Sequence, residues 1–161
     1  SRPHFFRGVA TVVTKLFCAV LPDRAYFGQK DAQQCVVVTR MARDLDLGVE
    51  IVEMPIVREA DGLAMSSRNR YLSAEERARA LCLSQALTEA GNMMNAGERD
   101  AETVKAAVRD RIALDAVVDY VELVDAATMR PLDRIEGVIL LAVAAKVGET
   151  RLIDNIKYTA L

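Results

Sequence analysis

The alternation of helices and strands in the first third of the chain limits its fold more than any other feature. An apolar stripe at helical spacing predicts a helix over residues 9–20, and a short strand is expected at 24–27. A second helix is predicted from about Asp31 to Leu47, followed by a strand at 49–52. Strands separated by helices in this order are parallel, so the segment predicts an α/β sheet with crossover connections. Because two short strands do not form an independently stable parallel sheet, we expect partner strands that this sequence does not contain.

The second part of the chain has a different pattern, which predicts a small α+β unit. A capping box that begins at Ser73 predicts a long helix ending near Asn95. Asp100 is expected to cap a further helix that ends near Leu114. Three antiparallel strands are then predicted, with a hairpin turn at Gly148 between the last two, over residues 117–124, 138–147 and 150–158.

The composition argues against several classes of protein. A hydrophobic fraction of 52% favours a folded chain over a disordered one. The net charge of -2 gives no reason to expect a nucleic acid or a membrane surface as a partner. No apolar run reaches the roughly 18 residues of a membrane helix. With one histidine and no Cys/His cluster, we expect no metal site built from protein ligands.

The cysteine pattern favours a cytoplasmic protein. Cys18, Cys35 and Cys82 lie in helical patterns without CxxC spacing, so we interpret them as reduced core or partly buried thiols. The sequence begins with Ser-Arg-Pro and contains no signal-peptide pattern. We therefore expect a cytoplasmic location.

The first segment that offers chemistry is 28–34. A strand that ends at Gly28 and a helix that begins near Asp31 present unpaired backbone N–H groups, which attract an anion. Lys30 adds a full positive charge at the same place. The alternative interpretation is structural, since Asp31 and Gln34 have the spacing of a helix capping box.

The second such segment is the loop from Glu59 to Arg70. Ser66-Ser67-Arg68 supplies two hydroxyls and a guanidinium in consecutive positions, and Gly62 adds flexibility nearby. Such a loop can close over a triphosphate and neutralise charge as pyrophosphate leaves. The alternative is a solvated linker, in which Ser, Asp, Gly and Arg are common. The apolar stretch 63–65 fits a solvated linker poorly.

Four segments together resemble the pantothenate synthetase family, whose members join pantoate to β-alanine through an acyl adenylate. The resemblance spans nearly the whole chain and is carried by residues 7–11, 26–34, 58–69 and 152–155. It places the chain in the nucleotidyltransferase superfamily. It implies an incomplete Rossmann-like parallel sheet at residues 1–56, as the C-terminal part of a nucleotide-binding domain. It further implies an α+β lid domain at 57–161, with helices on a three-stranded antiparallel sheet and a phosphate-binding loop at 61–70.

The resemblance also implies roles for individual residues. Lys30 would bridge the pantoate carboxylate and the α-phosphate of ATP, and Gln34 would hydrogen-bond pantoate. Magnesium would accompany ATP, coordinated mainly by phosphate oxygens. The catalytic residues would be Lys30, Ser66, Ser67 and Arg68, and Val9 and Val12 would line the pantoate pocket. ATP would contact Gly28, Gln29, Lys30, Asp31, Val57, Met65, Ser66, Ser67 and Arg68, with Gly28 and Asp31 at the ribose and the Val57 backbone at the adenine.

The chain departs from the family pattern in its histidines. The signature His-x-Gly-His is absent, since His4 is the single histidine. Phe5 stands where the family usually has a histidine, so we expect His4 to be a surface residue at the start of a helix. Gln29 replaces the glutamate of many relatives.

The expected partners are the small molecules pantoate and β-alanine. Exposed strand edges and the apolar face of helix 9–20 additionally predict a homodimer. The favoured function is an AMP-forming pantoate–β-alanine ligase for the parent protein, with the isolated chain inactive. The alternative is a truncated, non-catalytic module that forms a lid or half of a nucleotide site.

Overall fold

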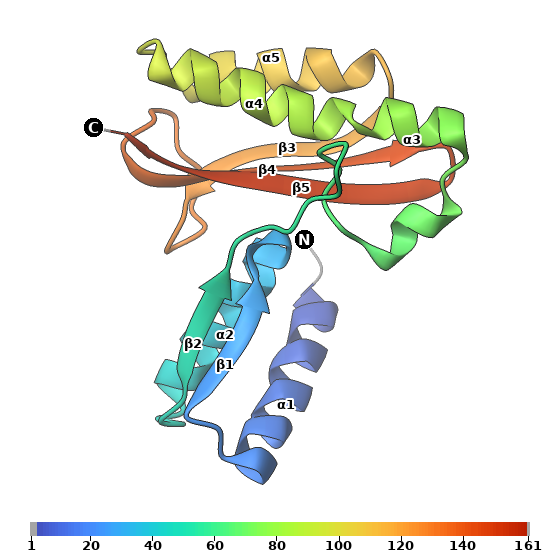
Figure 1. The fold of residues 1–161 in the computed structure, drawn as a ribbon. Coiled ribbons are helices and arrows are strands. Elements are labelled where there is room, and N and C mark those ends of the chain that lie inside the picture. Colours follow the sequence, from blue (N-terminus) through green and yellow to red (C-terminus); the bar gives the residue numbers. More distant parts are fainter. Residues whose placement is uncertain (1–2, 161) are drawn as a thin grey trace. The chain divides into compact units, whose positions relative to one another are not determined.

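The computed structural model describes residues 3–160, and its chain divides into two compact units. Unit 1 is Ser1–Ile56 and unit 2 is Val57–Leu161. Each unit is described by itself. Together they confirm the predicted fold class, a parallel α/β segment followed by an α+β segment (Figure 1).

Unit 1 contains the expected alternation of helices and strands. Strands β1 and β2 pair in parallel, with Ala25 beside Ile51 and Phe27 beside Glu53. The hydroxyl of Thr14, in the first α-helix, donates to Met41 Sδ in the second α-helix at 3.0 Å. The elements are α1 (Pro3–Val20), β1 (Arg24–Gly28), the 3-10 helix η1 (Gln29–Asp31), α2 (Ala32–Asp44) and β2 (Glu50–Met54).

The apolar stripe predicted for the first helix occupies two faces of α1. Phe17 is buried, and its ring lies 6.4 Å from the ring of Phe27 in β1. Val12, Leu16 and Val20 lie on a separate line with i, i+4 spacing, and more than half of each is exposed. The helix prediction is confirmed, and the exposed line of Val12, Leu16 and Val20 belongs to the apolar face from which the sequence predicts self-association.

Unit 2 places its α-helices on one face of a three-stranded antiparallel sheet of order β3-β4-β5 (Figure 1). Its core lies between these two layers, with Leu87, Ile112 and Leu141 almost fully buried. The elements are η2 (Ser67–Tyr71), α3 (Ala74–Ala80), α4 (Cys82–Asn95), α5 (Ala101–Ala113), β3 (Val117–Asp125), β4 (Gly137–Val147) and β5 (Thr150–Ala160).

Local sequence signals set the ends of these elements. Ser73 and Glu76 form both hydrogen bonds of the predicted capping box, at 3.2 and 2.8 Å. Asp100 accepts from the Thr103 amide at 2.7 Å and caps α5, as predicted. The hairpin turn at Gly148 is confirmed, with a φ of 55°. The long helix predicted to run to Asn95 is divided at Leu81, where ψ of −17° interrupts the α-helical hydrogen-bond ladder.

Candidate functional site

The predicted site residues fall into two groups, one in each unit. The group in unit 1 lies where β1 ends and α2 begins. Gly28 is exposed and extended, and a side chain added there would meet no atom within 4 Å. Neither the backbone conformation nor the neighbours therefore require a glycine, and its small size leaves open space before the first turn of η1. Cys35, in the first turn of α2, donates to the Gly28 carbonyl at 3.4 Å and fixes the strand end against the helix.

Asp31 does not cap α2. Its side chain makes no capping hydrogen bond, and its φ and ψ of −99° and 56° lie outside the extended region that a capping residue adopts. The capping-box interpretation of Asp31 and Gln34 is therefore wrong. The physical reason is that Asp31 ends the 3-10 helix η1 instead of leading in from a strand. Lys30 and Gln34 are half-buried beside the exposed Asp31.

The predicted pantoate-pocket residues Val9 and Val12 lie three positions apart on α1, so they are neighbours on one helix face. Val12 lines an open hollow of about 740 Å³, together with Arg7, Thr11 and Lys15, and Val9 is not among its lining residues. His4 also lines this hollow and is exposed. Its lining combines the apolar side chains of Val12 and Leu16 with the basic side chains of Arg7 and Lys15.

The group in unit 2 lies on an ordered loop. Residues 57–65 fold back on themselves as a short hairpin, in which the Met65 amide donates to the Val57 carbonyl at 2.9 Å. The Glu59 amide donates to Leu63 O at 2.8 Å, and the Gly62 amide closes the turn onto Glu59 O at 2.8 Å. Gly62 has a φ of 96°, which explains a glycine at this turn.

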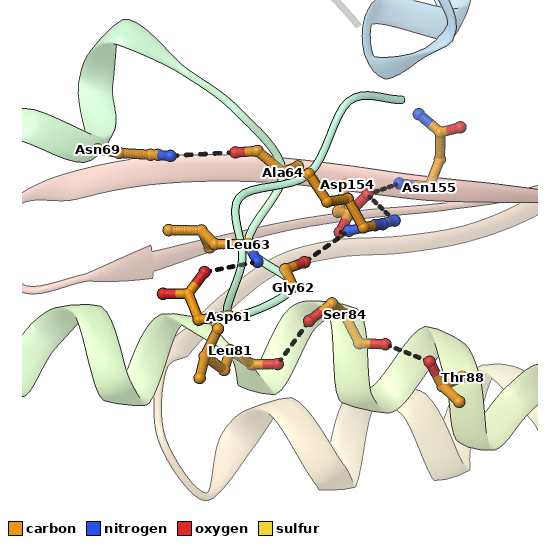
Figure 2. A network of polar contacts seen from close by, with 11 residues as sticks. Asp61, Gly62, Leu63, Ala64, Asn69, Leu81, Ser84, Thr88, Asp154 and Asn155 are labelled. Atoms are coloured by element: carbon orange, nitrogen blue, oxygen red, sulfur yellow. Dashed lines mark hydrogen bonds and ion pairs between the residues drawn. The ribbon is translucent and has the colours of Figure 1, made fainter. Parts of the chain in front are cut away.

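Apolar burial anchors this loop to the core of unit 2. Leu63 is 4% exposed and belongs to the main hydrophobic cluster, and Ala64 is buried beside it. Figure 2 shows Leu63 and Gly62 where the loop passes Asp154 of β5. The interpretation of this segment as a solvated linker is therefore wrong, because a linker would not bury two apolar side chains.

Charged groups anchor the same loop from two sides. Arg58 forms two hydrogen bonds with the buried Asp154 carboxylate, at 2.7 and 3.0 Å. Arg77 of α3 donates to both Glu59 and Asp61, at 2.5 and 2.8 Å. The buried Asn69 amide donates to Glu59 Oε1 at 2.7 Å and to Ala64 O at 3.1 Å.

These contacts shift the pKa values of the loop carboxyls. The Asn69 amide, and then Arg77, hold the pKa of Glu59 below its usual range. The Leu63 amide, and then Arg77, do the same for the pKa of Asp61. Glu59 in turn makes the largest contribution to the raised pKa of Arg77. The loop is thus held by ionised groups at neutral pH.

The predicted phosphate-binding residues are at the end of the anchored hairpin. Ser66 Oγ accepts from the Arg68 amide at 3.2 Å and opens the turn η2. Ser67, Arg68 and Met65 are exposed. The segment Met65–Arg68 therefore combines a backbone held by the hairpin and by η2 with side chains that are open to solvent, which suits the binding of a charged ligand.

Sequence reasoning missed the residues that hold the loop. Arg58 and Asp154 lie within two of the family-like segments, but no role was predicted for either of them. Their separation of 96 residues explains why local patterns did not connect them. Among residues 3–160, no group of three or more His, Cys, Asp or Glu side chains could hold a metal ion. No helix within the same range is long and apolar enough to span a bilayer.

The fold and these two groups define an α/β segment with an appended α+β unit that carries an anchored Ser-Ser-Arg loop. A model of the pantoate-beta-alanine ligase family matches residues 1–157, and the chain belongs to this family. Pantothenate synthetase of Acetivibrio thermocellus is 56% identical over 158 residues, which are 97% of this chain and 56% of that protein. The chain therefore spans little more than half the length of such relatives.

Solved structures show the same fold. The crystal structure of pantothenate synthetase from Thermus thermophilus has a TM-score of 0.87 and 45% identity, over 92% of this chain and 54% of that one. A pantoate-beta-alanine ligase from Francisella tularensis, complexed with beta-gamma ATP and beta-alanine, has a TM-score of 0.68 and 26% identity. That match covers 97% of this chain and 51% of the other.

Proposed function

We propose that the natural protein carrying this chain is an ATP-dependent ligase that condenses pantoate with β-alanine. The observation that carries the proposal is the family match over residues 1–157. The Francisella tularensis ligase, whose structure contains an ATP compound and β-alanine, supports the nucleotide and amine substrates. The anchored loop at Met65–Arg68 supports the binding of a polyphosphate.

The first proposed step activates the pantoate carboxylate. One carboxylate oxygen attacks the α-phosphorus of ATP, a new P–O bond forms, and the bond to the bridging oxygen of pyrophosphate breaks. Lys30 bridges the carboxylate and the α-phosphate, and so neutralises charge that grows in the transition state. Gln34 hydrogen-bonds pantoate, and Val9 and Val12 contribute apolar contacts. Positioning of the two reactants supplies much of the rate.

The second proposed step transfers the acyl group. The neutral amine of β-alanine attacks the acyl carbon of pantoyl adenylate, the C–O bond to AMP breaks, and the amine loses a proton. The products are pantothenate and AMP. No protein nucleophile takes part, so the residues of this chain act by binding, orientation and charge.

The nucleotide contacts follow the two groups of residues. Gly28 and Asp31 contact the ribose, where the open space at Gly28 admits a ligand, and Gln29 is a further nucleotide contact. The Val57 backbone meets the adenine. Ser66 and Ser67 donate hydroxyl hydrogen bonds to phosphate oxygens, and Arg68 adds a cation beside Met65.

Magnesium fits this arrangement as a companion of ATP. The donor set of Met65–Arg68 consists of hydroxyls, amides and one guanidinium, which bind phosphate oxygens and not a metal ion. When bound, Mg²⁺ would hold phosphate oxygens and neutralise their charge. We further propose a cytoplasmic homodimer, on the basis of the reduced cysteines and the exposed apolar line of α1.

The test is the activity of the natural protein that carries this chain. Lys30→Ala should lower kcat/KM for pantoate-dependent release of pyrophosphate by about 10²- to 10³-fold, since loss of one preorganised charge partner costs roughly 3–4 kcal/mol. Lys146→Ala, at an exposed position of β4, is the matched control and should leave the rate unchanged. Near-normal turnover in Lys30→Ala with a folded protein would contradict the mechanism.

A second candidate is a non-catalytic half-site, to which the exposed hydroxyl and guanidinium groups of Met65–Arg68 would contribute. In that case the chain binds nucleotide phosphates through Met65–Arg68 without turnover. Pantoate-dependent release of pyrophosphate by the natural protein distinguishes the two functions.

A further inference from the structure

Asp154 is a buried carboxylate with no place in the proposed chemistry. It lies in β5, is 3% exposed, and is among the few buried charged or polar residues that the structure describes. Its Oδ2 accepts from Arg58 Nη1 at 2.7 Å, and its Oδ1 accepts from Arg58 Nη2 at 3.0 Å. Oδ1 also accepts from the Asn155 amide at 2.8 Å (Figure 2). A buried charge held by three donors needs a reason, because burial of an ion is costly.

Arg58 connects this carboxylate to the first limb and to the turn of the loop. It is part of the first limb, one residue after Val57, and its Nη1 also donates to the Gly62 carbonyl at 3.1 Å, across the turn. One guanidinium thus ties the start and the turn of the hairpin to β5. A lysine could not reproduce this, since its ammonium lacks the planar fork.

The other limb of the hairpin leads directly into the candidate phosphate-binding segment. Leu63 and Ala64 are buried, and Met65 donates to Val57 O at 2.9 Å. The backbone position of Met65 therefore depends on the limb that Arg58 holds. Ser66, Ser67 and Arg68 follow within three residues, with their positions set by the same hairpin and by the turn η2.

We propose that Asp154 is a positioning residue, which acts through Arg58 to hold Met65–Arg68 in the arrangement that binds the phosphates of ATP. The proposal rests on the proposed function of the loop. Asp154 touches neither nucleotide nor reacting atoms in this scheme. Its effect is to keep the loop from exchanging among other conformations before the ligand arrives.

The test uses two variants and one matched control. Asp154→Asn keeps the size of the side chain and removes its charge. Arg58→Lys changes the partially exposed partner and leaves the strand untouched, so it remains informative if Asp154→Asn folds poorly. Asp119→Asn is the control, because it removes an ion pair with Arg151 that joins β3 to β5 in the same sheet and is separate from the Arg58–Asp154 pair.

The first readout is amide exchange in the 161-residue chain. In both variants we expect exchange at Glu59 and Met65 to quicken about tenfold or more, while amides of β4 keep their protection. Asp119→Asn should leave the loop amides unchanged. Unchanged exchange at Glu59 and Met65 in both variants would overturn the proposal.

The second readout is steady-state kinetics of the natural protein that carries the chain. We expect KM for ATP to rise about 3- to 30-fold, with KM for pantoate unchanged. A merely destabilising substitution would lower kcat through loss of folded enzyme and would leave both KM values as they were. A loosened loop with an unchanged KM for ATP would overturn the positioning role and leave the proposed ligase function intact. Absence of pyrophosphate release in the unsubstituted protein would instead overturn the proposed function, and the positioning role with it.

Discussion

The buried side chain of Asn69 donates to Glu59 across the base of the loop, with Asn69 Nδ2 at 2.7 Å from Glu59 Oε1. The same nitrogen lies 3.1 Å from Ala64 O. Because both neighbours can only accept a hydrogen bond, the amide nitrogen must face them. Asn69 Oδ1 is the buried side-chain atom that has no hydrogen-bond partner among the described residues. The Asn69 contacts are therefore specific for an amide.

We expect Asn69→Asp to destabilise unit 2 by about 2–3 kcal/mol, since a carboxylate would face two acceptors in a buried position. The measurement is urea denaturation at pH 7. Asn92→Asp, the same change at an exposed position of α4, is the control and should cost little. Equal stability of the two variants would show that Asn69 does not hold the loop.

The contribution of Glu59 and Asp61 to stability should depend on pH. Their pKa values are lower in the folded chain than in the unfolded one. Their contribution to the free energy of unfolding is therefore fully present above the usual pKa of a carboxyl group, and it is lost as the pH falls through the lowered pKa values of the folded chain. The urea midpoint of Glu59→Gln should therefore lie below that of the unsubstituted chain above pH 4.5, the usual pKa of a glutamate. The difference should narrow as the pH falls further. A difference that stays constant from pH 7 to pH 3 would contradict this linkage.

The turn at Gly148 lies against the capping box of α3. A methyl group added at Gly148 would overlap Glu76 Oε1, and the φ of 55° disfavours alanine as well. Gly148→Ala should lower the free energy of unfolding by about 2 kcal/mol, because it strains the backbone and displaces the Glu76 side chain from the capping box of α3. Gly137→Ala shares the positive φ but meets no neighbouring atom, so it should cost only about 1 kcal/mol. Equal losses in urea denaturation would show that Glu76 moves aside freely.

Local signals were sufficient for most of unit 2. The caps at Ser73 and Asp100 and the turn at Gly148 each depend on residues within four positions of one another, so the sequence displays them directly. At Asp31 the same reasoning was wrong, because a 3-10 turn before α2 changes the backbone angles that a cap needs.

The candidate site could be predicted only in part. The residues of Met65–Arg68 and Lys30 were identified by their chemistry and by family resemblance. The groups that order the loop were not, because the Arg58–Asp154 contact joins residues far apart in the sequence. Apolar spacing located the stripe of α1 but not which of its side chains are buried, because spacing shows the faces of a helix and not what covers each of them.

The exposed apolar line on α1 predicts self-association of the 161-residue chain. Leu16 is 56% exposed between Val12 and Val20, and burial of such a line against a second copy is favourable. Leu16→Glu should shift the sedimentation of the chain from dimer to monomer. Leu114→Glu, a change at a 77% exposed position after α5, should leave the dimer in place. A monomer for the unsubstituted chain at tens of micromolar would refute this prediction.

The last prediction concerns nucleotide binding by the 161-residue chain. The candidate phosphate-binding residues belong to two units, with Lys30 in the first and Ser66, Ser67 and Arg68 in the second. The 161-residue sequence has no His-x-Gly-His motif that could add further contacts. A triphosphate that is not held from all sides gains little from each contact, because the preorganised arrangement is incomplete.

We therefore expect the 161-residue chain to bind ATP with a Kd in the millimolar range or weaker, which corresponds to a favourable binding free energy of ~4 kcal/mol or less. With ATP, magnesium and pantoate it should release no pyrophosphate. Calorimetric or NMR titration measures the first quantity, and a coupled pyrophosphate assay measures the second. A pyrophosphate signal that disappears in Lys30→Ala would contradict this prediction, since it would show that Lys30 and the anchored loop suffice for adenylation without further segments.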